Sequence, residues 1–159
     1  HKLKKQLQII TTEWKTYRIS PSESISLYGA KRRKFISSSL YWGEAGYGAL
    51  TGIRSGYLEG GVFLGYMYAP QLFDSITERL FVDYRVFMGA GGGGDAPQGG
   101  GLIIHPTIGL GTTLSYKTRV FLEIGYMHFL NGNISSPTIA ININFLTWNI
   151  STTTKKGAL

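Results

Sequence analysis

The sequence contains no cysteine, which excludes several kinds of site and one means of stabilisation. Without thiols the chain has no disulfide framework, no thiolate ligand for a metal ion and no cysteine nucleophile. It also lacks a run of about 18 apolar residues, the length that a helix needs to cross a bilayer. A transmembrane helix is therefore not expected, although 43% of the residues are hydrophobic.

Strong helix formers such as alanine and glutamate are sparse, whereas threonine, serine, tyrosine, isoleucine and valine dominate the periodic segments. β-Branched and aromatic residues favour strands. We therefore expect an all-β chain. Its 159 residues suit one domain with a substantial core. We predict a single domain over residues 1–159, with residues 1–5 and 151–159 as tails.

The segment Leu80–Gly89 shows the pattern that decides between fold classes. Side chains alternate across a strand. One face of this strand would carry Leu80, Val82, Tyr84, Val86 and Met88, and the other Phe81, Asp83, Arg85, Phe87 and Gly89. A soluble sandwich would turn the charged face to water. A membrane barrel would instead turn the apolar face to lipid and the charges to its interior.

Four further segments, of eight to thirteen residues, repeat this division into an apolar face and a face of small and polar residues. Nine to eleven tilted residues suffice to cross a bilayer, and soluble strands are typically shorter. We predict an antiparallel up-and-down transmembrane β-barrel of about eight strands. Its lipid-facing positions would include the following residues: Leu64, Val82, Ile104, Leu122 and Ile141.

The opposite faces of the same strands supply polar groups for the interior. The predicted interior network consists of Glu59, Asp83, Arg85, His105, Glu123, Asn142 and Asn144. Buried charges must be paired, so we expect Arg85 to bond to a carboxylate such as that of Glu123. Eight strands leave room for little besides side chains. We interpret this set as structural; an ion path or a ligand site around His105 is the alternative.

The first 55 residues are harder to divide into strands. We expect strands at Gln6–Arg18 and Phe35–Trp42. Glu44–Thr51 is either a separate short strand or the continuation of Phe35–Trp42, and counting it separately brings the total to eight. The connections alternate in length, as in outer-membrane barrels. Ser115–Thr118 is a tight turn on the periplasmic side, and Gly89–Gly101 and Asn131–Pro137 are longer outside loops. Ala69–Thr77, with a helical turn at Gln71–Asp74, would be an unusually long inside turn.

The formal net charge of +7 comes largely from Lys2–Lys5, Lys31–Lys34 and Lys155–Lys156. We place these clusters in loops and tails. No nucleic-acid partner is predicted, because no binding motif accompanies the charges. The glycines at Gly91–Gly94 and Gly99–Gly101 precede a strand and lack the Lys-Ser/Thr step of a phosphate loop. No cofactor and no metal site are predicted.

Two segments resemble bacterial outer-membrane proteins. Pro137–Phe145 looks like their last strand, which ends in a closing Phe; Leu146, Trp148 and Ile150 continue out of phase, as at a bulge or a tail. Tyr126–Gly132 resembles the His-x-Ser-Asn signature of lipid A deacylases, eight-stranded barrels whose catalytic groups face lipid near the outer rim. His128 and Asn131 match, but Leu130 replaces the nucleophilic Ser, and Asn142 stands near the place of the orienting Glu.

We therefore predict a protein that is not an enzyme, with no catalytic residues and no hydrolase activity at His128. It would be a structural or docking component of the cell envelope in the bacterial outer membrane. Its partners would be outer-membrane lipid and a protein or second copy on the periplasmic side. A lipid A-modifying enzyme is the first alternative, and a soluble lipocalin-like ligand-binding barrel the second. An exported chain loses its signal peptide, so a start at His1 is expected of a processed protein.

Overall fold

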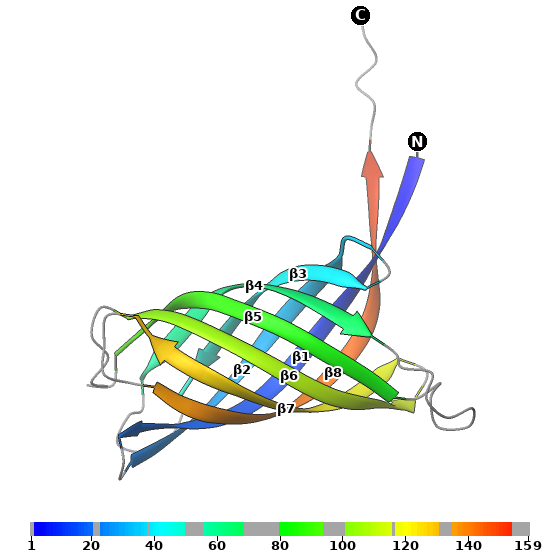
Figure 1. Ribbon diagram of the computed structural model, residues 1–159. Helices are drawn as coiled ribbons and strands as arrows, with labels where there is room; N and C mark the ends of the chain where they lie inside the picture. The colour runs from blue at the N-terminus through cyan, green and yellow to red at the C-terminus, as the bar shows by residue number, and fades with distance from the viewer. Residues whose placement is uncertain are drawn as a thin grey trace, which may run out of the picture.

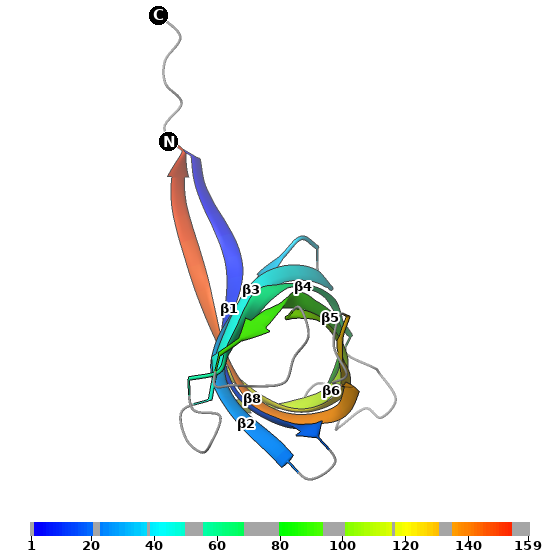
Figure 2. The ribbon, with the colours of Figure 1, turned by 90° about the vertical axis from the view of Figure 1, so that its left-hand side faces the viewer.

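The computed structural model describes residues 2–20, 23–37, 39–49, 56–68, 80–93, 101–115, 117–130 and 135–153, and within β1 and β8 the side chains of residues 8–18 and 135–147. Eight antiparallel strands form a closed barrel in chain order (Figures 1 and 2). The strands are β1 (Lys2–Ser20), β2 (Glu23–Phe35), β3 (Leu40–Gly48), β4 (Leu58–Tyr68), β5 (Leu80–Gly92), β6 (Leu102–Ser115), β7 (Thr118–Phe129) and β8 (Ser135–Thr153). The predicted fold is confirmed.

The strands are staggered around the barrel. Paired residues can be followed from one strand to the next through Tyr17, Thr138, Gly125, Thr107, Arg85, Gly65, Tyr41 and Phe35. Phe35 adjoins Lys34, whose partner on β1 is Gln8. One circuit thus ends about ten residues from its start, a stagger that tilts the strands by roughly 40°.

The N-terminal part corrects two predicted boundaries. Phe35 ends β2, and the segment expected as a strand at Phe35–Trp42 contains the turn into β3, in which the amide of Leu40 donates to Ser37 Oγ at 3.1 Å. Leu40–Gly48 then forms one strand, so Gly43 does not divide two. The strand Glu23–Phe35 was missed because its run of basic residues was interpreted as a loop. The total of eight strands is nonetheless right.

Burial alternates along the strands and separates the two faces of the wall. The outer face is largely apolar, and the inner face encloses the core. Apolar groups fill both ends of the barrel around a charged middle. Toward the termini these are Ile9, Phe35, Met67, Phe81, Phe121 and Leu146; toward the other end they are Ile25, Leu27, Ile103, Met127 and Phe129.

β1 and β8 continue past the barrel wall. Residues 2–7 of β1 pair with 148–153 of β8, whereas β2 and β7 reach only Gln8 and Phe145. This two-stranded ribbon projects from the end where the termini lie (Figures 1 and 2). Residues 2–5 and 151–153 are thus not tails as predicted, because they pair with each other; residues 1 and 154–159 lie outside the described residues.

Inner and outer residues keep alternating at the end of β8. The pairing of β8 with β1 runs without a register shift, so no bulge follows Phe145. Leu146 comes next on the inner face after Asn142 and Asn144, and it packs against the core. The sequence suggested a break in the alternation only because the inner face changes from polar to apolar residues at the end of the barrel.

The connections agree with the predicted alternation only in part, because Ser20 pairs with Glu23 and so joins β1 to β2 by a short connection at the end opposite the termini. Ser115 pairs with Thr118, as expected of a tight turn at the end where the termini lie. At the opposite end, Gly93 and Gly101 adopt φ of 92° and 70°, values that favour glycine, at the two ends of the glycine-rich loop. The segments 69–79, 94–100 and 131–134 lie outside the described residues. Across the described parts of the chain, no helix is long and apolar enough to span a membrane.

Candidate functional site

Among the residues whose side chains are described, eight charged ones are buried in the interior of the barrel. Four are cationic and four anionic: Lys15, Lys31, Arg33 and Arg85, and Glu13, Glu59, Asp83 and Glu123. They project from the inner faces of strands β1, β2, β4, β5 and β7. This buried set carries no net formal charge, so the excess of +7 is carried by the rest of the chain.

Arg85 and Glu123 form the best-aligned pair of this network. Arg85 Nη1 donates to Glu123 Oε1 at 3.1 Å, and Nη2 donates to Oε2 at 2.5 Å. This two-point geometry is the strongest form of a charge-assisted hydrogen bond. Asn142 Nδ2 donates to the same carboxylate at 2.5 Å. Glu123 therefore links β5, β7 and β8 across the interior.

Further charges surround this pair. Lys31 Nζ donates to Glu13 Oε1 at 3.2 Å and lies 3.7 Å from Glu123 Oε1. Arg33 Nη1 lies 3.1 Å from Asp83 Oδ2. The hydroxyl of Tyr41 donates to the other oxygen of Asp83. Each charge thus has more than one partner of opposite sign or a polar neighbour, which offsets part of the cost of removing it from water.

A second group lies nearer the end opposite the termini. Lys15 pairs with Glu59 and lies 3.7 Å from the centre of the Tyr47 ring. Tyr17 and Tyr57 both donate to Glu59 Oε2, each at 3.1 Å. Burial, and next the Glu59 carboxylate, raise the pKa of Tyr57, so its phenol keeps the proton that it donates. These tyrosines fix Glu59 near this end of the barrel.

Neutral groups complete the polar interior. His105 Nε2 lies 2.6 Å from Thr138 Oγ1. Thr11 donates to Asn144 Oδ1 at 2.6 Å. The seven residues expected in the interior are all buried there, at exposures of 6% or less. His105 contacts a hydroxyl, and among the described residues no group of His, Asp or Glu is placed to hold a metal ion.

Sequence reasoning missed half of the charged set. Glu13 and Lys15 lie within the expected first strand, but their alternation with the outward Thr12 and Trp14 was not used. Lys31 and Arg33 were assigned to a loop. The available signal was the period of two in Ala30–Lys34, which turns every second basic residue inward. Because interior cations are unusual in a core, the run looked like a solvated segment.

Interior glycines leave the space that large side chains occupy. A Cβ on Gly65 would collide with the ring of Tyr41, and one on Gly111 with that of Phe121. These glycines lie opposite the bulky residues on neighbouring strands, Gly65 beside Tyr41 and Gly111 beside Phe121. The interior is thereby packed with rings and charged groups, as eight strands allow.

A second candidate site lies on the outer face. His128 and Ser135 are directly paired residues of β7 and β8, near the end opposite the termini. Both are exposed, and His128 Nδ1 lies 2.6 Å from Ser135 Oγ. Leu130 stands at the nucleophile position of the sequence signature, whereas the hydroxyl beside His128 comes from Ser135 on the next strand. Asn142 cannot orient His128, because it lies on the inner face and bonds to Glu123.

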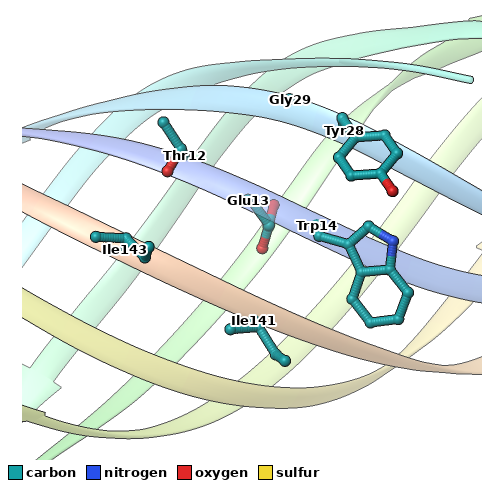
Figure 3. A pocket seen from close by; sticks show the side chains of 7 residues that line it. All are labelled: Thr12, Glu13, Trp14, Tyr28, Gly29, Ile141 and Ile143. Atoms are coloured by element: carbon teal, nitrogen blue, oxygen red, sulfur yellow. The ribbon is translucent and has the colours of Figure 1, made fainter. Parts of the chain in front are cut away.

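The five predicted lipid-facing residues all lie on the outer face. Leu64, Leu122 and Ile141 are about half exposed, and Val82 and Ile104 are half-buried. A hollow of about 420 Å³ in the wall is lined in part by Ile141, Trp14 and Tyr28. Figure 3 shows these side chains, with Trp14 and Tyr28 on neighbouring strands. The lining of the hollow is mostly apolar, in keeping with a wall that meets hydrocarbon.

No protein-family model and no curated protein matches this sequence. Among solved structures, the barrel is similar to a chain described under "De novo design of transmembrane beta-barrels". The TM-score is 0.56 at 12% identity, over 89% of this chain and 95% of that one. It is also similar to the crystal structure of neisserial surface protein A, with a TM-score of 0.54 at 10% identity, over 91% and 99%. At such identities the likeness shows the fold alone.

Proposed function

We propose that this chain is a barrel of the bacterial outer membrane that acts as a non-catalytic structural or docking component of the envelope. The observation that carries the proposal is the arrangement of the two faces of the wall, which is the inverse of that in a soluble barrel. Most outward side chains are apolar, and eight charges are buried inside. This is the arrangement of a barrel in lipid. A lipocalin-like soluble barrel needs the reverse, a polar exterior around an apolar cavity.

The filled interior argues against permeation. Charged pairs occupy the middle, and apolar groups close both ends. An aqueous path would require these ion pairs to separate and the aromatic groups to move. A barrel of this kind contributes its surfaces, which are the lipid-facing wall, the loops and the projecting ribbon.

The ribbon of residues 2–7 and 148–153 is the candidate docking element. If the termini lie in the periplasm, as in other barrels of even strand number, the ribbon extends there from the membrane. Each of its strands has one partner in the described chain, so the outer edges of both are open. Open edges accept a further strand. Its sequence includes Lys2, Lys4 and Lys5, which favour an acidic partner.

We expect replacement of Lys2, Lys4 and Lys5 by serine to weaken binding of an acidic periplasmic protein by about tenfold or more. Raising the salt concentration should weaken the wild-type complex in the same way, because exposed charges are screened. Crosslinking in native membranes, followed by quantification of the partner, measures this. Arg18→Ser is the matched control, since Arg18 is an exposed cation at the opposite end of β1. Wild-type membranes in which nothing but a second copy is crosslinked would contradict the docking role.

A lipid-modifying enzyme remains the second candidate because of one observation, the contact between His128 and Ser135. A serine hydroxyl beside a histidine base is the core of a hydrolytic site. It lies on the outer wall near the rim opposite the termini, where the ester groups of lipids would be. The contact also has a structural explanation, since the two residues are cross-strand neighbours.

We expect lipid A from cells that produce the wild-type protein to keep all its acyl chains, as a non-catalytic role requires. Mass spectrometry of extracted lipid A checks this. Loss of an acyl chain that is abolished by both Ser135→Ala and His128→Ala would establish the enzyme instead. Ser136→Ala is a suitable control, because its side chain is buried on the opposite face of β8.

A further inference from the structure

The outer wall of the barrel is not uniform. On β4–β8 it is covered by large apolar side chains, with exposed residues such as Leu64, Val86, Leu110, Ile124 and Ile141. On β1–β3 the large apolar residues Ile10, Tyr28, Leu40 and Trp42 are also exposed, but the wall between them carries smaller and more polar residues. They include Thr12, Ser24, Ser26, Ala30, Arg32, Glu44 and Gly46. One side of the barrel is therefore less suited to lipid than the other.

The centre of this side holds an ion pair. Arg32 and Glu44 bond across β2 and β3, and their side chains are 48% and 54% exposed. Glu44 is the middle residue of β3. On the outer face the pair lies between two aromatic residues, Trp42 toward the end with the termini and Tyr28 toward the other end. The pair thus lies within the apolar band, where a charge that faces lipid is unfavourable.

The surface beside the ion pair is hollow. A depression of about 500 Å³ is lined by Ile10, Ala30, Lys31, Arg32, Glu44, Ala45, Gly46 and Gly61. A Cβ placed on Gly46 would meet no atom within 4 Å, so this glycine leaves open surface. Small residues at such a place let a second membrane protein approach closely.

We propose that the face formed by Thr12, Ala30, Arg32, Glu44 and Gly46 binds a second copy of this chain in the membrane. Charge complementarity selects this occupant. The face presents one cation and one anion side by side, and a two-fold axis between two copies brings Arg32 of each against Glu44 of the partner subunit. Four charges then satisfy one another away from lipid. The interface is lateral, and it is separate from the ribbon and independent of any partner bound there.

Cysteine crosslinking tests the location of the interface, and the chain's lack of native cysteine makes each introduced thiol unique. Ala30→Cys should give a dimer in native membranes with a short thiol-specific crosslinker. Ile124→Cys is the matched control, because Ile124 is an exposed residue of β7 on the apolar wall. Equal crosslinking at both sites, or none at Ala30, would overturn the proposal. So would a product that contains a different protein.

Charge reversal tests whether the face binds a second copy of the chain. Arg32→Glu makes the face wholly acidic and Glu44→Arg makes it wholly basic, so each variant alone should lose about tenfold or more of its dimer. Co-expressed with different tags, the two variants should form a mixed dimer, since an acidic face meets a basic one. Absence of the mixed dimer, with both barrels shown to be folded by heat-modifiable migration, rules out the proposed pairing. These results do not depend on the lipid A and ribbon experiments, so either proposal can fail alone.

Discussion

Replacing Glu123 by glutamine is expected to lower the free energy of unfolding by about 3–5 kcal/mol. The carboxylate binds Arg85 at two points and lies 3.7 Å from Lys31 Nζ. Glutamine keeps the shape but removes the negative charge, and it leaves a surplus of buried cations. Chemical denaturation of the folded barrel in lipid vesicles measures the change.

The double variant Arg85→Met/Glu123→Leu separates the charge from the packing. It removes one charge of each sign, so it should be more stable than Glu123→Gln, although it removes more atoms from the pair. Apolar replacements of a complete buried pair are often neutral or stabilising, whereas loss of one partner is costly. Arg18→Gln, at an exposed site, should change stability by less than about 0.5 kcal/mol. A loss below about 1 kcal/mol in Glu123→Gln would mean that the interior pairs are hydrated rather than dry.

Arginine at Val86 is expected to destabilise the barrel by about 2–4 kcal/mol, because this side chain faces outward near the middle of β5. The same substitution at Val82 should cost only about 0–1 kcal/mol, since Val82 is the third residue of the strand and lies near the end with the termini. The sequence places Val82 among the lipid-facing residues, and the bounds of β5 place it near one end of the strand. The bounds of β5 put the position most sensitive to arginine at Val86, four residues further along the same face.

The two variants form their own control, because both place arginine on one face of one strand. Unfolding in vesicles of defined thickness compares them directly, and thinner bilayers should reduce the penalty at Val86. Equal tolerance of arginine at both positions, in a barrel that stays in solution without detergent, would remove the support for a membrane location.

The sequence predicts the inner and outer faces most completely on β4–β8. There the alternation of apolar with small or polar residues is strict, so both faces follow from parity alone. Asp83, Arg85 and Glu123 were assigned to the interior on that basis, and the structure places them there. The count of eight strands rested on the same pattern together with the requirement for an even number.

The remainder depended on tertiary structure, because its signals are not local. In β2 the basic run hid the alternation, and only closure of the sheet brings Lys31 near Glu123 and Arg33 near Asp83. The pair of Lys15 with Glu59 joins residues 44 apart, and that of Arg85 with Glu123 joins residues 38 apart. The contact of His128 with Ser135 likewise depends on the register of β7 and β8. Parity along one strand assigns a side chain to a face, but the stagger between strands decides which side chains meet.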